Sequence, residues 1–126
     1  MRAVVLDAGA LIALESHDRR MAALVEAIVT YRVPTFVPAS VVAQTWRGGP
    51  RQHHISRLLK SRALRVMPLD DETARRIGLL LGATGTADVV DAHVADLAAY
   101  VGHATVYTSD PSDIRILNPH LTVKRV

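Results

Sequence analysis

The sequence predicts an α/β protein with a mainly parallel five-stranded sheet and helices on both faces. Short runs rich in valine alternate along the whole chain with longer stretches of helical periodicity, a pattern typical of parallel sheets. No linker, repeat or low-complexity segment interrupts this alternation, and 126 residues are the size of one domain. We therefore expect residues 1–126 to form a single domain.

The strand-like runs come first in this prediction. They combine valine with aromatic and other apolar residues over a few positions, and helical stretches lie between them. These runs cover residues 3–6, 35–37, 64–67, 104–108 and 121–126.

Helical patterns fill the intervals between the strands. In residues 19–32 the apolar side chains recur every three or four positions and so lie on one face. Ser40 is predicted to cap the N-terminus of a helix that the glycines and proline at 48–50 end. The predicted helices cover residues 9–15, 19–32, 41–46, 51–62, 70–83 and 87–101, and a further helix starts at Asp110-Pro111.

The composition narrows the class of protein. The chain has no cysteine, which excludes disulfides, thiolate metal sites and thiol catalysis. No stretch of the sequence is apolar for long enough to span a bilayer, and Asp7 interrupts the first apolar run too early for an export signal. The net charge is +3 with arginine as the main cation, which permits a polyanionic partner. We expect a cytoplasmic protein without a membrane segment.

Aspartates stand where the predicted strands end. Asp7 follows the first strand and Asp110 follows the fourth, while Asp88 and Asp91 lie one turn apart near the start of the helix between them. The carboxyl ends of parallel strands meet at one edge of the sheet, where ligands bind. Carboxylates gathered there repel one another unless a cation lies between them. The pattern therefore predicts a site for a hard divalent metal ion.

Each aspartate also has an ordinary structural interpretation. Asp7, Asp88 and Asp110 are all suitable N-caps, and acids are favoured in the first turn of a helix. Capping requires no particular strand, however, and the acids follow two strand ends and one helix that leads into the second of those strands. Their convergence favours a functional site.

The segments that contain these acids resemble the acidic motifs of PIN domains, most closely those of VapC-like toxins from bacterial toxin–antitoxin pairs. They are residues 5–14, 91–98 and 106–114. The resemblance implies a three-layer fold with strand order 3-2-1-4-5 and an endoribonuclease that depends on Mg²⁺ or Mn²⁺. It also implies a homodimer and a VapB-like antitoxin that lies across the active-site groove.

The resemblance assigns roles to individual residues. Asp7, Asp91 and Asp110 match acids that hold the metal, and Asp113 matches a supporting acid. With Asp88 and Gln44, Asp113 is expected to orient water. Gln44 stands where the family usually has its second acid, and Ala8-Gly9 stand where a hydroxyl residue often follows the first acid. Both differences bear on metal affinity and turnover.

Basic residues after Gln44 offer a surface for RNA. Arg47, Arg51 and Arg57 follow it closely, and cations beside the groove would hold phosphates. The alternative is an ordinary solvated helix face. Trp46 is expected either to pack against the core or a partner or to stack on an unpaired base.

Two other functions fit parts of the pattern. One is a PIN-like domain without catalysis that binds RNA or an antitoxin, because Gln44 and Ala8 depart from the family's motifs. The other is a phospho-receiver domain with Asp70 or Asp71 as the phosphoacceptor, which leaves the acids at 88, 91 and 113 without a role.

Overall fold

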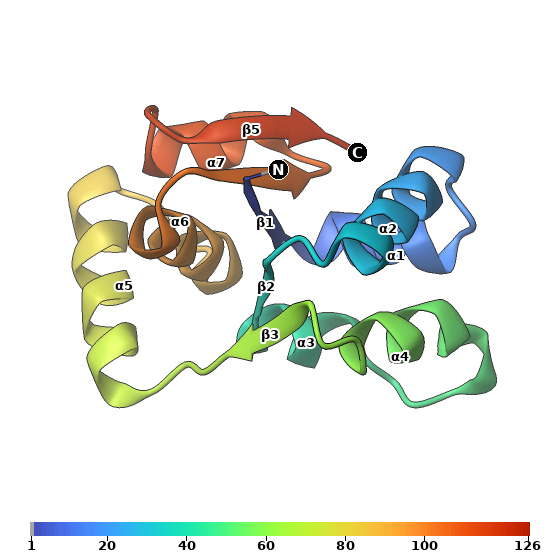
Figure 1. Ribbon diagram of the computed structural model, residues 1–126. Helices are drawn as coiled ribbons and strands as arrows, with labels where there is room; N and C mark the ends of the chain where they lie inside the picture. The colour runs from blue at the N-terminus through green and yellow to red at the C-terminus, as the bar shows by residue number, and fades with distance from the viewer. Residues whose placement is uncertain (1) are drawn as a thin grey trace.

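The sheet has five strands in the order β3-β2-β1-β4-β5, and all four pairings are parallel (Figure 1). The computed structural model describes residues 2–126. Both the α/β class and the strand order that the sequence implied are confirmed. The strands are β1 (Ala3–Leu6), β2 (Thr35–Pro38), β3 (Leu64–Met67), β4 (Ala104–Thr108) and β5 (Thr122–Arg125).

Helices cover both faces of the sheet and give three layers (Figure 1). One face carries α1 (Ala8–Glu15), α2 (Arg19–Tyr31) and α4 (His53–Leu59), and the other carries α5 (Asp71–Thr84), α6 (Val89–Val101) and α7 (Pro111–Leu117). The short α3 (Ala39–Thr45) follows β2 directly and contacts α1 and α6. Within the described residues, no helix is long and apolar enough to cross a membrane.

The central strand is buried on both sides, which explains its uninterrupted apolar sequence. Val4, Val5 and Leu6 are almost fully buried, as expected for a parallel strand between two helical layers. Helix α6 is buried nearly all round because the sheet, α5 and α7 pack against it. These two elements form the centre of the core and hold the edge of the sheet where Asp7 lies.

The strand order excludes the phospho-receiver alternative. Domains of that class have the order 2-1-3-4-5, in which the third strand lies inside the sheet. Here β3 is an edge strand. Asp70, the proposed phosphoacceptor, instead caps α5 by accepting a hydrogen bond of 2.9 Å from the backbone N–H of Thr73.

The prediction that Ser40 caps α3 is wrong. The helix begins at Ala39, with Pro38 in the cap position. The Ser40 hydroxyl is hydrogen-bonded to Nδ1 of His93 over 2.7 Å. His93 is only 1% exposed, and a buried ring nitrogen needs a partner, so this tertiary bond takes the hydroxyl that would otherwise cap the helix.

The predicted helix over 51–62 is also too long, because α4 covers only His53–Leu59. Gln52 explains the late start. Its buried side chain donates a hydrogen bond to the carbonyl of Thr45 and accepts one from the backbone N–H of Arg47. These bonds fix Gln52 in a 3₁₀ turn that joins α3 to α4.

Gly9 lies in close contact with the end of β4. A Cβ atom at this position would come within 2.6 Å of the Ser109 Cβ and 2.9 Å of the Ser109 backbone nitrogen, and closer still to the Ser109 hydroxyl. We therefore expect Gly9→Ala to lower the free energy of unfolding by about 1–3 kcal/mol, the usual cost of overpacking, measured by urea denaturation.

A matched control is Gly49→Ala, because no heavy atom lies within 4 Å of a Cβ placed there. The double variant Gly9→Ala with Ser109→Gly should recover part of the loss, since it removes the closest atoms. Equal stabilities for Gly9→Ala and Gly49→Ala would contradict this account of the contact.

Candidate active site

The pairing of β1 with β4 brings together residues 100 positions apart in the chain. Leu6 is in register with Tyr107, and the backbone N–H of Asp7 donates to the carbonyl of Tyr107 over 3.1 Å. Asp7 is therefore opposite Thr108, at the carboxyl edge of the sheet. Asp7 is only 5% exposed to solvent.

Thr108 connects two of the acids, a role that the sequence analysis missed. Its side chain is fully buried and hydrogen-bonded to the Asp7 carboxylate, and its hydroxyl oxygen accepts a bond of 2.9 Å from the backbone N–H of Asp110. The signal was present in the sequence, because a hydroxyl residue at the end of the fourth strand falls opposite Asp7 once these strands are paired. Thr108 thus orients Asp7 toward the segment that holds Asp110.

Capping accounts for two of the acids but not for the others. Oδ1 of Asp7 accepts a hydrogen bond of 3.0 Å from Ala10 N–H, and Oδ1 of Asp88 accepts one of 2.9 Å from Asp91 N–H. Asp110 occupies the cap position of α7, yet its side chain makes no capping bond. Capping bonds therefore account for Asp7 and Asp88 but not for Asp91, Asp110 and Asp113.

The five aspartates lie close enough to affect one another's ionisation. The pKa of Asp91 is raised from 3.8 to about 6, first because burial disfavours its charge and then because of the charges of Asp88, Asp113, Asp7 and Asp110. Such perturbation by several neighbouring acids is typical of functional sites. Of these acids, Asp88, Asp91 and Asp113 line one pocket between α6 and α7.

Two further acids have raised pKa values. Burial raises the pKa of Asp7, against the opposing effect of its hydrogen bonds from Thr108 and two backbone groups. A hydrogen bond with Asp110 and the charge of that residue raise the pKa of Asp113. The raised pKa values of Asp7, Asp91 and Asp113 therefore favour the protonated form of these three carboxyls.

The chemistry of this donor set fits Mg²⁺ or Mn²⁺. All the candidate ligands are carboxylates, the hard oxygen donors that these ions prefer, and Mg²⁺ commonly takes only one or two protein carboxylates and keeps several waters. Within residues 2–126, no group of three acidic or histidine side chains is placed to hold a metal ion. The assignment of Asp7, Asp91 and Asp110 as ligands stays a prediction.

The other predicted site residues lie in separate places. Gln44, Arg47 and Arg51 line an open groove between α1 and the α3–α4 connection, whereas Asp88, Asp91 and Asp113 line a smaller pocket of about 170 Å³ between α6 and α7. Arg57 lines neither of these and lies in a hollow between α2 and α4. Trp46, at the end of α3, is 37% exposed.

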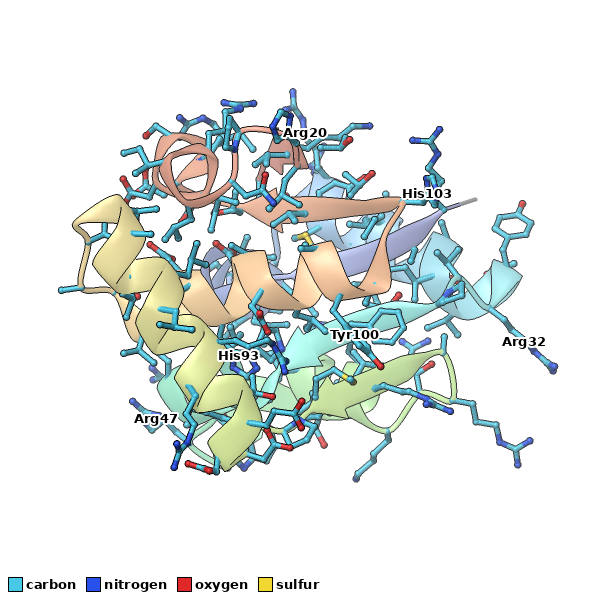
Figure 2. All side chains as sticks on the ribbon, turned by 90° about the vertical axis from the view of Figure 1, so that its left-hand side faces the viewer. Arg20, Arg32, Arg47, His93, Tyr100 and His103 are labelled. Atoms are coloured by element: carbon cyan, nitrogen blue, oxygen red, sulfur yellow. The ribbon has the colours of Figure 1, made fainter. Side chains whose placement is uncertain are left out.

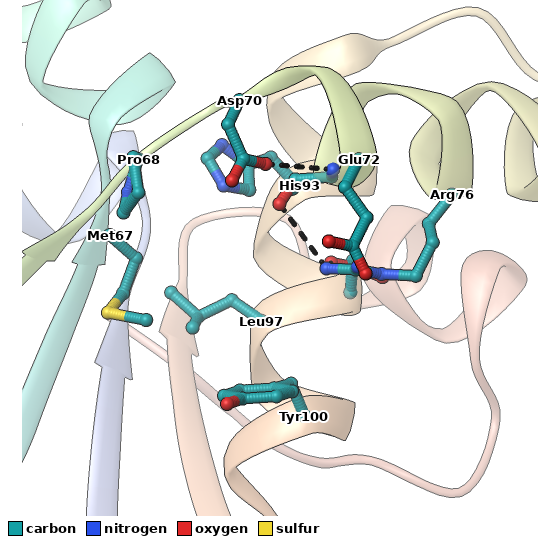
Figure 3. A pocket seen from close by; sticks show the side chains of 10 residues that line it. Met67, Pro68, Asp70, Glu72, Arg76, His93, Leu97 and Tyr100 are labelled. Atoms are coloured by element: carbon teal, nitrogen blue, oxygen red, sulfur yellow. Dashed lines mark hydrogen bonds and ion pairs between the residues drawn. The ribbon is translucent and has the colours of Figure 1, made fainter.

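A further pocket of about 230 Å³ lies between α5 and α6, around His93 (Figure 3). Its charges are largely paired, since Arg76 bonds to both Asp96 and Glu72. The His93 ring bonds to Ser40 and to the carbonyl of Pro68, and burial lowers its pKa. The uncharged ring of His93 therefore links α3, α6 and the segment after β3, and we assign it a structural role.

Comparisons with known proteins agree with this architecture. A family model described as the PIN domain matches residues 4–116. The chain therefore belongs to the PIN domain family. A search of curated proteins gave no match.

Solved structures show the same fold. A chain in the structure of VapBC2 from Rickettsia felis, bound to a DNA fragment from their promoter, has a TM-score of 0.66 at 13% identity, and the match covers 98% of both chains. A chain of FitAB bound to an IR36 DNA fragment has a TM-score of 0.65 at 18% identity, with 97% of this chain and 94% of that chain covered. A chain of FitAcB from Neisseria gonorrhoeae has a TM-score of 0.58 at 18% identity, and the match covers 95% of both chains.

The raised pKa of Asp91 predicts how stability varies with pH in the absence of divalent metal. Between its unfolded value of 3.8 and its folded value of about 6, the folded state binds more protons than the unfolded state. The free energy of unfolding should therefore fall as pH rises through this interval. Thermal or urea unfolding in EDTA from pH 4 to 7 measures this.

Asp91→Asn should flatten this part of the profile and make the metal-free protein more stable at pH 7 than the parent. Asp71→Asn is the control, because Asp71 is a highly exposed carboxylate on α5, paired with Arg75. If the free energy of unfolding of Asp91→Asn varies with pH as the parent's does, the pH dependence does not come from Asp91.

Proposed function

We propose that this chain is a metal-dependent endoribonuclease and the toxin of a VapBC-like toxin–antitoxin pair. The observation on which this rests most is the pKa of Asp91, which burial and the charges of four neighbouring aspartates raise to about 6. A PIN domain match over residues 4–116 supports nuclease activity, since PIN domains are generally nucleases. The toxin role is supported by the likeness of the fold to chains of VapBC2 and FitAB.

Asp7, Asp91 and Asp110 would hold Mg²⁺ or Mn²⁺, with one or two of them in direct contact and the others bonded through water. A bound divalent ion would activate water as a nucleophile and offset charge on the scissile phosphate. Asp7 is fixed for this role by its bonds to Ala10 and Thr108.

The other polar side chains would orient water and substrate. Asp88 and Asp113 border the same pocket as Asp91, where their oxygens can accept hydrogen bonds from water. Gln44 offers an amide in the separate groove between α1 and the α3–α4 connection. We further expect a homodimer and a VapB-like antitoxin as partner, in keeping with the family resemblance.

The main alternative is a PIN domain that binds RNA or an antitoxin without cleaving RNA. The observation that favours it is Gln44, an uncharged side chain where the family usually has an acid. Metal binding separates the two functions, because the non-catalytic form predicts no binding at millimolar Mg²⁺ or Mn²⁺.

Asp7→Asn should abolish metal-dependent RNA cleavage, with a loss of at least about 100-fold in rate. The amide keeps the capping oxygen for Ala10 but lacks the charge that a divalent ion requires. Cleavage of a labelled single-stranded RNA with Mg²⁺ or Mn²⁺, compared with EDTA, measures the effect.

Asp71→Asn serves as the charge-matched control and should retain parental activity. Cleavage by Asp7→Asn at the parental rate, in a preparation free of contaminating nuclease, would contradict the proposed function.

Gln44→Glu tests the departure from the family pattern. If Gln44 lies within reach of the ion, a carboxylate there should raise Mg²⁺ affinity about tenfold or more, measured by isothermal titration calorimetry at pH 7. The comparison is Glu15→Gln, which changes a charge on the same groove. Gln52→Glu would not serve, because Gln52 is buried. An unchanged affinity in Gln44→Glu would remove Gln44 from the proposed site.

A further inference from the structure

A pocket of about 270 Å³ on the β5 side of the molecule brings three cations together from distant parts of the chain. Arg20 comes from the first turn of α2, and Lys124 and Arg125 come from the end of β5. No local sequence pattern places these three cations together. The other residues that line the pocket are Met21, Leu24, Tyr107 and Val126.

This cationic pocket reaches the carboxyl edge of the sheet, on the face that carries α2 and opposite α6 and α7. Arg125 is in register with Thr108, the residue that bonds to Asp7 and to the Asp110 backbone. Neighbouring strands are about 4.8 Å apart, so Arg125 lies about 10 Å from Asp7 across β4. Arg125 also donates a hydrogen bond of 2.9 Å to the carbonyl of Ser109, which directs it toward the segment that leads to Asp110.

The positive charge of the pocket is not neutralised within the protein. The ion pairs of residues 2–126 involve only Arg75 and Arg76, both on α5. Arg20, Lys124 and Arg125 are exposed, and no carboxylate of the described residues lies within ion-pair distance of them. They can therefore meet an external anion without first breaking an internal pair.

The basic residues expected from the sequence lie on the other side of the site. Figure 2 shows Arg47 near α3 and Arg20 near β5, at opposite ends of the sheet. The guanidinium of Arg47 donates hydrogen bonds to the carbonyls of Ala43 and Trp46. Part of its hydrogen-bonding capacity is therefore used at the C-terminal end of α3. The pocket at β5 is linked to the acidic edge by strand register, because Arg125 pairs with Thr108, which lies opposite Asp7.

We propose that the pocket formed by Arg20, Lys124 and Arg125 binds a backbone phosphate of the RNA strand, flanking the bond that is cleaved. This inference rests on the proposed function. A group of five aspartates repels an RNA backbone, so the strand needs cations close to the site. The apolar lining by Met21, Leu24 and Tyr107 provides a surface on which the adjoining ribose or base can pack.

A phosphate contact of this kind positions the strand and does not read its sequence. It lies outside the reacting group, so it contributes equally to binding of the substrate and of the transition state. Its loss should therefore raise KM and leave kcat unchanged.

The test compares the double variant Arg20→Gln with Lys124→Gln against the parent. Binding of a fluorescent single-stranded RNA is measured by anisotropy in Mg²⁺ over a range of salt concentrations, on a timescale shorter than cleavage, and kcat and KM are measured separately. Loss of this phosphate contact should weaken binding on the order of tenfold at 0.1 M salt and reduce the slope of log K against log salt by about 0.7.

The control is the double variant Arg32→Gln with Lys60→Gln, which loses the same charge from the amino-terminal edge of the sheet. Arg32 precedes β2 and Lys60 precedes β3, and Figure 2 shows Arg32 far from Arg20. This control should bind and cleave RNA like the parent. Lys124→Arg, combined with native Arg20, should retain tight binding because it keeps the charge.

The outcomes separate this inference from the proposed function. Equal effects of the two double variants, or a fall in kcat with unchanged KM, would overturn the phosphate assignment while leaving the nuclease in place. A parent protein that neither binds nor cleaves RNA would overturn the proposed function and this inference with it.

Discussion

The burial and crowding of carboxylates at the β1–β4 edge is the constraint on which the rest of this structure depends. Burial and four neighbouring acids raise the pKa of Asp91 to about 6, and burial raises that of Asp7. In the metal-free protein this arrangement disfavours the ionised form of both carboxyls. Stability is lost at neutral pH to keep charges together, which is the kind of local cost that proteins retain at functional sites.

The fold supplies the means of holding this group in place. The strand order makes β1 and β4 neighbours, and α6 packs on both strands while leading into β4. The Asp7 side chain is held by Ala10 and Thr108, and the Ser40–His93 bond ties α3 to α6. The Asp7–Thr108 and Ser40–His93 contacts join elements that are separate in the sequence, so the site depends on the tertiary structure as a whole.

Local sequence patterns were sufficient for the strands and most helices. All five strands agree with the structure to within about a residue at each end, because buried parallel strands have continuous apolar sequences. Ser40 and the start of α4 were mispredicted for one common reason. In both, the local pattern assigned a side chain to the helix, but the structure uses that side chain in a hydrogen bond outside the helix. Ser40 bonds to His93, and Gln52 bonds to the carbonyl of Thr45.

The site was predictable in part. The order and spacing of Asp7, Asp91 and Asp110 indicated an acidic group, and their positions after strand ends gave its place in the sheet. Thr108 and the pocket of Arg20, Lys124 and Arg125 were not found, because each depends on strand register or on packing between α2 and β5. The relation of Gln44 to the acids likewise depends on how α3 packs, which no local pattern specifies.

The most direct test of the account is a ¹³C NMR titration of the aspartate side-chain carboxyl carbons, with and without Mg²⁺. The account predicts one carboxyl that titrates near pH 6 in the metal-free protein, is absent from Asp91→Asn, and shifts to markedly lower pH when Mg²⁺ is added. Titration of every aspartate below about pH 4.5 without metal, or a titration near pH 6 that Mg²⁺ leaves unchanged, would contradict the claim that these carboxylates share a cation.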